Sequence, residues 1–305
     1  MKVVDLEIPV PNDNQILIKV MAAGVNRPDI IQRQGNYPPP ENHSPILGLE
    51  VSGYIEKIGK NVKNFSLNNK VAALVNGGGY AEFCLAEQES TFKIPGDLSF
   101  NEAACIPECY FTAWSNLVQR GKLTRNQKVL IHGGTSGIGI AAIQIAKIFN
   151  AKVIATTSSR ERMLKAKEIG ADYVINYNEE SEWWKKVREI TNKKGVDIVV
   201  EVGGSKTLEQ SIKCSKTGAV IGIIGVLSGG IAELPIGRVI YKASRLIGIS
   251  CGNKIELTNM IEKFNTSNTK PVIDSIFKFS DLPKALNYMS KGKHLGKIAI
   301  DFKKK

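Results

Sequence analysis

The sequence predicts an α/β protein in which a doubly wound parallel sheet is inserted into a mostly β domain. From Lys128 onward, short runs rich in β-branched residues alternate with helical stretches. Strands separated by helices of this length pair in parallel through right-handed crossovers, which leaves helices on both faces of the sheet. The region before Lys128 reads instead as short strands punctuated by Gly, Pro and Asn.

The central region justifies this fold class element by element. Each strand is a short apolar run, and each helix follows it after a small-residue turn or a polar connection. The expected elements, in order, are KVLIHG, a helix over 137–149, KVIATT, a helix over 160–169, DYVIN, a helix over 179–190, VDIVVE, a helix over 205–214, and GAVIGIIG.

The flanking regions give the domain organisation. Four strands are expected before the central region, at QILIKVMAAGV, GLEVSGYIEKIG, NKVAAL and YAEFCLA. After about Ile255 the chain offers two helices and a closing strand, GKIAIDF, which we expect to return to the first domain. The domains are therefore predicted as 1–109 (β), 110–254 (parallel sheet) and 255–305 (return).

Composition bounds the function classes. At 305 residues with 43% hydrophobic and 23% charged content, the chain reads as an ordinary globular protein of two domains. The longest apolar run is too short for a membrane span, and five cysteines without Cys-x-x-Cys spacing suggest reduced thiols, so we expect a cytoplasmic protein. The net charge of +12 is spread along the chain, which is weak support for a nucleic-acid partner.

A glycine-rich turn at Gly134-Thr-Ser-Gly137-Ile-Gly139 follows an expected strand and opens an expected helix. Small residues there let a pyrophosphate approach the backbone, and the helix N-terminus attracts it. The plain G-x-G-x-x-G pattern is not met, since Ser136 takes the middle glycine position. A dinucleotide site is the interpretation we favour over a structural turn.

Cofactor preference is encoded where the second strand of the central region ends. An acidic residue there would bind the 2′-hydroxyl of an adenosine ribose. This chain has Thr157 at that position, followed by Ser158, Ser159, Arg160 and Arg162. Guanidinium groups favour a 2′-phosphate, so NADPH is predicted over NADH.

Seven stretches in this order resemble the medium-chain dehydrogenase/reductase superfamily, and specifically its zinc-independent quinone oxidoreductases. They are AAGVNRPDIIQRQGNYPPP, ILGLEVSG, NGGGYAEF, AACIPECYFTAW, KVLIHGGTSGIGIAAIQIAK, VINY and HLGKIAI. The resemblance implies a chaperonin-10-like β catalytic domain, an inserted Rossmann domain, a homodimer, and reduction of quinones or activated enones.

The same resemblance assigns site residues. It places Asn26, Asp29 and Thr112 at the catalytic cleft, although Asn26 also fits the N-cap of a helix with Pro28 in its first turn. The cofactor contacts it implies are Tyr37, Ser136, Gly137, Ile138, Gly139, Ser158, Arg162, Tyr177, Val202, Gly225, Val226 and His294. For Tyr177, an ordinary core or surface tyrosine is an equally reasonable interpretation.

No metal is expected. Zinc-dependent members of the superfamily use a Cys after the first glycine turn and a His in Gly-His-Glu, where this chain has Gly24-Val-Asn26 and Gly48-Leu49-Glu50. Leucine cannot ligate zinc, and a four-cysteine structural lobe is also missing.

The chain departs from the family in three places. It begins at what resembles the family's second strand, so the usual opening hairpin is expected to be missing and one sheet edge exposed. Glu201 replaces the usual Asp in a shortened VVEVGG turn, and the segment after the sixth strand contracts to ISCGNK.

Two functions from different classes follow. The favoured one is an NADPH-dependent, zinc-independent reductase of quinones or enones. The alternative is a catalytically weak cofactor-binding protein with a structural or RNA-binding role, prompted by the +12 charge and the lack of an obvious acid/base pair. A short-chain dehydrogenase is disfavoured, because the glycine turn lies mid-chain and no Tyr-x-x-x-Lys pair is present.

Overall fold

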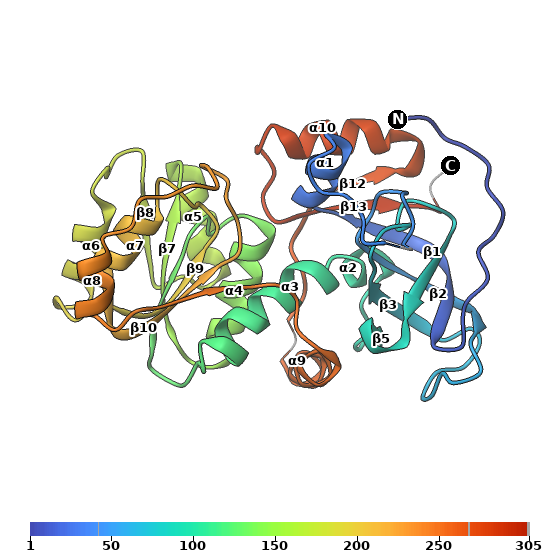
Figure 1. The fold of residues 1–305 in the computed structure, drawn as a ribbon, viewed down its shortest axis with the longest axis horizontal. Coiled ribbons are helices and arrows are strands. Elements are labelled where there is room, and N and C mark those ends of the chain that lie inside the picture. Colours follow the sequence, from blue (N-terminus) through green and yellow to red (C-terminus); the bar gives the residue numbers. More distant parts are fainter. Residues whose placement is uncertain (42, 268, 304–305) are drawn as a thin grey trace. The chain divides into compact units, whose positions relative to one another are not determined.

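A computed structural model describes residues 1–41, 43–267 and 269–303 (Figure 1). The described chain divides into two compact units. The first, called the β unit below, comprises residues 1–108 and 253–305, and the second, the parallel-sheet unit, comprises residues 109–252. No helix among the described residues is long and apolar enough to cross a membrane.

The parallel-sheet unit has six strands in the order β11-β10-β9-β6-β7-β8. They are β6 (Lys128–Ile131), β7 (Lys152–Thr157), β8 (Tyr173–Asn176), β9 (Val196–Glu201), β10 (Ser215–Ile223) and β11 (Arg245–Gly248). Every adjacent pair is parallel. The strand order reverses direction between β6 and β9, and in such sheets ligands bind beyond the carboxyl ends at this switch point.

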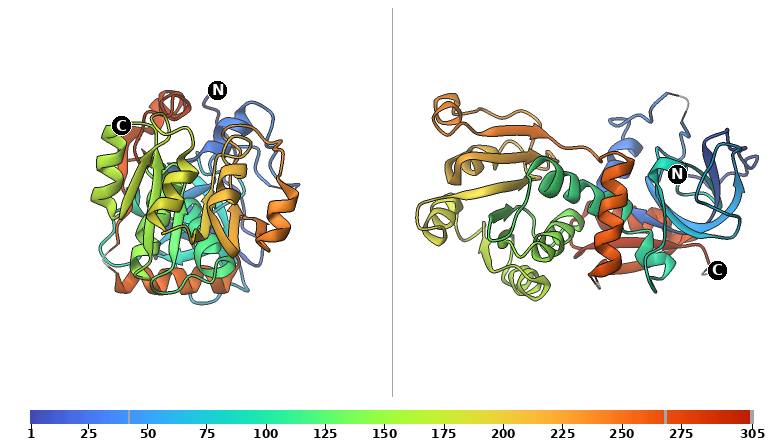
Figure 2. Two further views of the ribbon diagram at one scale, coloured as in Figure 1. Left: turned by 90° about the vertical axis from the view of Figure 1, so that its left-hand side faces the viewer. Right: turned by 90° about the horizontal axis from the view of Figure 1, so that it is seen from below.

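Helices cover both faces of this sheet, as the predicted crossovers require (Figure 2). On one side α4 (Gly137–Ile148) contacts α5 (Arg160–Ile169), and on the other α7 (Leu208–Cys214) contacts both α6 (Trp183–Ile190) and α8 (Ile236–Tyr241). The strands between them are buried on both faces, with Leu130, Ile154, Val199 and Ile221 in the core.

Two helices start later than their sequence patterns predict. The helix expected from residue 179 starts at Trp183, because the Asn176 carbonyl and side chain hold residues 178–180 in a turn. The helix expected from residue 205 starts at Leu208, because Ser205 and Lys206 bond instead to the loop at Ser228. In both places local polar contacts compete with the helical hydrogen bonds.

The β unit contains a seven-stranded sheet. Its main path is β12-β13-β1-β2-β3-β5, and β4 pairs with β1. These strands are β1 (Gln15–Val25), β2 (Glu50–Ile58), β3 (Lys70–Leu74), β4 (Phe83–Glu87), β5 (Thr91–Lys93), β12 (Ile273–Lys278) and β13 (Lys297–Asp301). The C-terminal strand β13 pairs antiparallel with β1, as the closing strand's lack of a partner helix suggests, whereas β12 had no sequence signal that we recognised.

Short helices complete the β unit. They are α1 (Arg27–Arg33), α2 (Phe100–Ala103), α9 (Lys254–Thr266), α10 (Leu282–Ser290) and the 3-10 turns η1 (Gln88–Ser90) and η3 (Phe279–Asp281). The helix α1 packs against α10 (Figure 1). The division between the units falls within α3 (Pro107–Trp114), which continues into the π-helix η2 (Ser115–Arg120).

We predict that Gly139→Ala destabilises the parallel-sheet unit. A Cβ at Gly139 would lie 2.1 Å from the Gly133 carbonyl oxygen, so the helix and the turn would have to separate. Overpacking of this kind costs about 1–3 kcal/mol, and the midpoint of thermal unfolding should fall by several degrees. The control is Gly237→Ala in α8, where an added Cβ meets nothing within 4 Å; equal midpoints for the two variants would contradict the prediction.

Candidate active site

The predicted cofactor contacts of the parallel-sheet unit gather at the carboxyl ends of its strands. Ser136 to Gly139 follow β6, Ser158 and Arg162 follow β7, and Tyr177 follows β8. Val202 follows β9, and Gly225 and Val226 follow β10. The parallel topology therefore brings to one sheet edge residues that are up to ninety positions apart (136 to 226).

The glycine-rich turn has the geometry of an anion site. The positive φ falls on Gly133, at 60°, rather than on a residue of the motif itself. Ser136 is the N-cap of α4, and its hydroxyl accepts a hydrogen bond from the Gly139 N–H at 3.0 Å. The N–H groups of Gly137 and Ile138 have no acceptor within the helix and stand at its positive end.

The end of β7 presents a buried hydroxyl and a guanidinium group, with no acidic side chain at the last residue of the strand. Thr157 Oγ1 is buried and has no hydrogen-bond partner among the described residues, which leaves it available to a ligand. The side chain of Arg162 extends from the first turn of α5 toward the glycine-rich turn, where its Nη1 lies 2.8 Å from Thr135 Oγ1. No carboxylate ends the strand, in keeping with a ligand that is itself anionic.

The turn after β9 is held by the carboxylate of Glu201, which sequence patterns identified only as an unusual replacement. Its Oε1 accepts hydrogen bonds from the Gly203 N–H at 2.7 Å and the Gly204 N–H at 3.2 Å. Val202 beside it is 7% exposed, and its carbonyl oxygen lies 2.9 Å from where a Cβ on Gly225 would stand. Gly225 therefore lets the β10 loop pack closely against this turn.

In the β unit, Asn26 and Asp29 belong to a buried polar cluster. Asn26 is the N-cap of α1, with Pro28 in the first turn, as its sequence context suggests. Its Nδ2 donates to Glu50 Oε1 at 2.9 Å, and Lys297 Nζ donates to its Oδ1 at 2.5 Å. Lys297 also lies 2.7 Å from Glu50 Oε1, which makes an ion pair with both side chains almost fully buried.

Close approach to this ion pair explains the glycine at position 24. A Cβ on Gly24 would lie 2.0 Å from Glu50 Oε1 and 2.6 Å from the Ala104 carbonyl oxygen. Glu50 Oε2 accepts a further hydrogen bond from the Glu108 N–H. Sequence patterns did not point to Glu50 or Lys297, although a Lys in an apolar strand (KIAID) was a signal that could have done so.

Asp29 is fully buried and differs from Glu50 in having no cation as a direct partner. Its Oδ2 accepts from the Asn26 N–H and from the Tyr80 hydroxyl, both at 2.7 Å, while Oδ1 has no partner among the described residues. Burial raises the pKa of Asp29 from 3.8 to about 7, against the opposing effect of these hydrogen bonds. The carboxyl group can therefore hold a proton close to neutral pH.

The other predicted site residues are less closely tied to these groups. Thr112 is buried in α3, and its Oγ1 lies 3.3 Å from Cys251 Sγ, within the parallel-sheet unit. Tyr37 and His294 both belong to the β unit. Tyr37 is 48% exposed, whereas His294 is buried against the Tyr288 ring, 6.3 Å between centroids.

No group of three or more His, Cys, Asp or Glu that could hold a metal ion is found among the described residues. Leu49, at the position of the histidine ligand of zinc-dependent relatives, precedes β2 and is partly buried. All five cysteines are free thiols.

Comparison with known proteins agrees with this geometry. Residues 12–114 match the family model of the alcohol dehydrogenase GroES-like domain, and residues 137–266 match that of the zinc-binding dehydrogenases. The chain is 32% identical to the quinone oxidoreductase of Homo sapiens over 251 residues, which cover 81% of this chain and 74% of the human protein.

Two solved structures are similar over nearly the whole chain. An NAD-dependent alcohol dehydrogenase superposes with a TM-score of 0.88 at 29% identity, covering 98% of this chain and 94% of that chain. A mycobacterial protein in complex with NADPH superposes with a TM-score of 0.89 at 27% identity, with the same coverage of both chains.

We predict that Asp29→Asn changes the pH dependence of stability. Because folding raises the pKa of Asp29, the folded protein keeps a proton that the unfolded chain releases between about pH 4 and pH 7. The wild type therefore loses stability over this range, by roughly 1.4 kcal/mol for each unit of pKa difference. The amide cannot ionise. The free energy of unfolding of the variant, measured with urea, should therefore rise relative to that of the wild type between pH 5 and pH 8.

Asp172→Asn, in the parallel-sheet unit, is the control, because the pKa of Asp172 is lowered and its charged partners are lysines rather than a histidine. Burial would raise that pKa, but a hydrogen bond from the Val153 N–H and the ion pairs with Lys147 and Lys152 outweigh the effect. The difference in free energy of unfolding between this control variant and the wild type should stay constant between pH 5 and pH 8. A constant difference for Asp29→Asn as well would show that Asp29 is ionised throughout.

Proposed function

Because the chain belongs to the medium-chain dehydrogenase/reductase superfamily, with quinone oxidoreductase relatives and a nicotinamide dinucleotide as cofactor, we propose that it reduces quinones or activated enones with NADPH, without zinc. The observation that carries the proposal is a sheet edge with a glycine-rich turn after β6 and Arg162 but no acidic residue after β7, in a chain that has Leu49 in place of a metal-binding histidine.

In this proposal, different residues of the parallel-sheet edge contact different parts of the cofactor. Ser136, Gly137, Ile138 and Gly139 face the pyrophosphate, and Ser158, Arg162 and Tyr177 face the adenosine phosphate. The N–H groups of Gly137 and Ile138 are the donors, because those of Ser136 and Gly139 already bond to the Gly133 carbonyl and to Ser136 Oγ. Val202, Gly225 and Val226 lie on the nicotinamide side, with Thr112 near it. For Tyr37 and His294, which belong to the β unit, a cofactor contact is proposed from the family resemblance alone. When bound, NADPH supplies the hydride.

The choice of substrate follows from the absence of a Lewis acid. A zinc ion would polarise an alcohol or a simple carbonyl, and without one the acceptor must take hydride readily by itself, as quinones and enones do. Asn26 and Asp29 line the substrate region in this proposal. Asp29, with its pKa of about 7, is able to hold a proton there under neutral conditions.

The test is NADPH oxidation with a panel of ortho- and para-quinones, measured with and without a chelator on protein of known zinc content. We expect turnover with at least one quinone, no near-stoichiometric zinc, and no loss on chelation. Loss of activity on chelation and recovery with zinc would overturn metal independence. No turnover with any quinone or enone, despite bound NADPH, would favour the cofactor-binding alternative.

A cytoplasmic location is part of the proposal. It is supported by the five free thiols, four of which are buried. Reduced cysteines persist in the reducing cytosol, whereas secreted proteins tend to form disulfides. Fractionation of cells that produce the protein would test the location directly.

We predict that Arg162→Glu weakens NADPH binding and leaves NADH binding nearly unchanged. The two cofactors differ only by the 2′-phosphate, and a charge-assisted hydrogen bond is worth about 1.5–3 kcal/mol. Reversing the sign should therefore cost roughly tenfold to several hundredfold in affinity for NADPH. Fluorescence titration of both cofactors measures the difference.

The matched control is Lys165→Glu, the same charge reversal on the same helix. Lys165 pairs with Glu168 at the surface of α5, at 3.1 Å, and should affect neither cofactor strongly. Equal loss of NADPH and NADH in Arg162→Glu would mean that the contact with Thr135 supports the glycine turn and that Arg162 does not select the phosphate.

We also propose a homodimer formed through the β11 edge of the parallel sheet. β11 ends the strand order, and exposed apolar side chains lie near it in sequence, including Ile236, Ile240 and Tyr241 at 67%, 74% and 84% exposure. An apolar sheet edge invites pairing with a second copy.

We predict a dimer mass in sedimentation at micromolar concentration, and a monomer for Ile247→Lys in β11, because a charge on an edge strand opposes pairing. Ile255→Lys, at an isoleucine of the β unit that is 71% exposed, serves as the control and should stay dimeric. A wild-type mass of one chain would contradict the prediction.

A further inference from the structure

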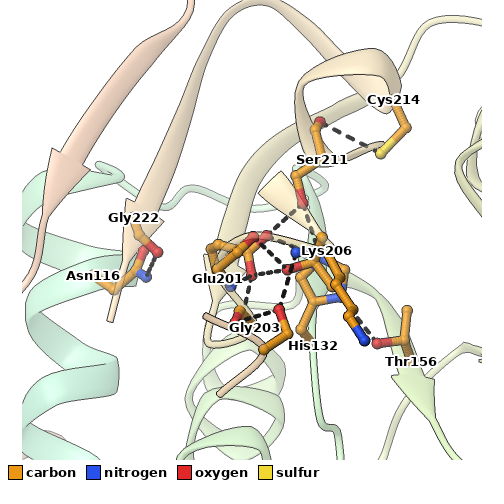
Figure 3. A network of polar contacts seen from close by, with 12 residues as sticks. Asn116, His132, Thr156, Glu201, Gly203, Lys206, Ser211, Cys214 and Gly222 are labelled. Carbon is orange, nitrogen blue, oxygen red and sulfur yellow. Dashed lines mark hydrogen bonds and ion pairs between the residues drawn. The ribbon is translucent and has the colours of Figure 1, made fainter. Parts of the chain in front are cut away.

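A buried polar network lies beneath the carboxyl edge of the parallel sheet and converges on Glu201 (Figure 3). Glu201, at the end of β9, is fully buried. Besides the two N–H groups of the Gly203–Gly204 turn, its Oε1 accepts from Thr207 Oγ1 at 2.6 Å, and its Oε2 accepts from Ser211 Oγ at 2.7 Å. Both carboxylate oxygens are therefore occupied by donors from the turn and from α7.

His132 extends this network to the neighbouring strand. Its ring is 3% exposed, with Nε2 2.9 Å from Ser211 Oγ and Nδ1 3.0 Å from Thr156 Oγ1 (Figure 3). Since Ser211 donates its only proton to Glu201, its oxygen must accept from His132 Nε2–H, and Nδ1 then accepts from Thr156. For a neutral imidazole, these contacts allow one tautomer and a single direction of donation, from Thr156 to Glu201.

The charges of the pair agree with this assignment. Burial lowers the pKa of His132, against the opposing effect of Glu201. Burial alone would raise the pKa of Glu201, but the attraction of His132 in its protonated form and the hydrogen bonds from Thr207, Ser211 and the Gly203 N–H hold it below its usual range. The network therefore contains one buried anion, and its donors are what keep it stable there.

The opposite side of the turn is held as well. Ser228 Oγ donates to the Gly203 carbonyl oxygen at 2.8 Å and accepts from the Lys206 N–H at 3.0 Å. Gly204 has φ of 88°, and a Cβ there would lie 2.5 Å from the Gly229 carbonyl oxygen. The turn is therefore held by Glu201 on one side and by the 225–229 loop on the other.

We propose that Glu201 is a positioning residue that fixes the Val202–Gly204 turn for the nicotinamide end of the cofactor, with His132 and Ser211 orienting its carboxylate. This proposal rests on the proposed function, because it assigns the turn to the nicotinamide side. Glu201 touches neither cofactor nor substrate in this role. It acts through the backbone of Gly203 and Gly204.

The substitution Glu201→Gln tests the proposal with a side chain of the same shape. Its amide can keep an oxygen toward Gly203 and Gly204, but the NH₂ group then faces Ser211, whose oxygen already accepts from His132. Removing the charge weakens the bonds to the turn, so hydrogen exchange at the amides of Gly203 and Gly204 should accelerate about tenfold, because a hydrogen bond to a neutral acceptor is weaker than one to a charged acceptor.

Ligand binding separates positioning from general damage. Adenosine 2′,5′-bisphosphate occupies only the adenosine end, so its affinity for Glu201→Gln should stay within about twofold of the wild type, whereas NADPH should bind about tenfold more weakly. Ser211→Ala should also accelerate hydrogen exchange at Gly203 and Gly204 and weaken NADPH binding. Both effects should be smaller than those of Glu201→Gln. Ser215→Ala is the matched control for Ser211→Ala: Ser215 is also buried, its hydroxyl donates to the Ile212 carbonyl oxygen at 2.9 Å, and its substitution should change neither.

The outcomes are distinct. If Glu201→Gln weakens the binding of both ligands equally, Glu201 supports the unit as a whole. If hydrogen exchange and NADPH affinity are both unchanged, the turn needs no carboxylate. Either result overturns the proposal. If Glu201→Gln does not fold, Ser211→Ala against Ser215→Ala decides by the same criteria. A wild type that binds the bisphosphate but not NADPH would defeat the proposed function, and the exchange measurement alone would then decide whether Glu201 holds the turn.

Discussion

A carboxylate withdrawn from water must find all its hydrogen-bond donors within the protein, and each unit of this chain contains one that does so. Glu50 in the β unit and Glu201 in the parallel-sheet unit are both fully buried. Glu50 is neutralised by Lys297, from the C-terminal strand, while Glu201 is stabilised by hydroxyl and backbone donors around it. Both carboxylates tie together segments that are distant in the sequence or belong to different elements.

In the β unit this constraint links the C-terminal strand to the region around α1. Lys297 comes from β13, which pairs with β1, and donates to both Asn26 and the Val25 carbonyl. Lys297 forms its ion pair with Glu50, and the hydrogen-bond partners of Asp29 among the described residues are the neutral Asn26 N–H and Tyr80 hydroxyl. Asp29 is therefore the group whose charge changes near neutral pH, and Tyr80 is bonded directly to it.

In the parallel-sheet unit the same constraint acts at the edge where a cofactor is proposed to bind. The glycine-rich turn after β6 depends on helix geometry and on the close approach of Gly139 to Gly133. The turn after β9 depends on a buried anion and its donors. The two turns lie on either side of the switch point between β6 and β9, so one ligand could use both. Different interactions hold the two turns rigid. A single substitution can therefore loosen one turn and leave the other unchanged.

Much of the fold follows from the sequence pattern alone. Alternating apolar runs and helical stretches determine the parallel sheet, because buried parallel strands and crossover helices leave strong local signals. The glycine-rich turn and the lack of an acidic residue after β7 are equally local, and so is the absence of a histidine at position 49. The expectation that the closing strand returns to the first domain came from its lack of a partner helix, and the pairing of β13 with β1 agrees with it.

Only the tertiary structure decided the rest, because the interactions concerned join residues that no short window contains. The late starts of α6 and α7 depend on Asn176 and on the loop at Ser228, which compete with helical hydrogen bonds. Glu50, Lys297 and Tyr80 are ordinary residues until the fold encloses them with Asn26 and Asp29. Glu201 looked like a simple replacement in the sequence. Its partner His132 is 69 residues away along the chain (132 to 201). The carboxylate acquires its role only because the fold buries it beside that imidazole.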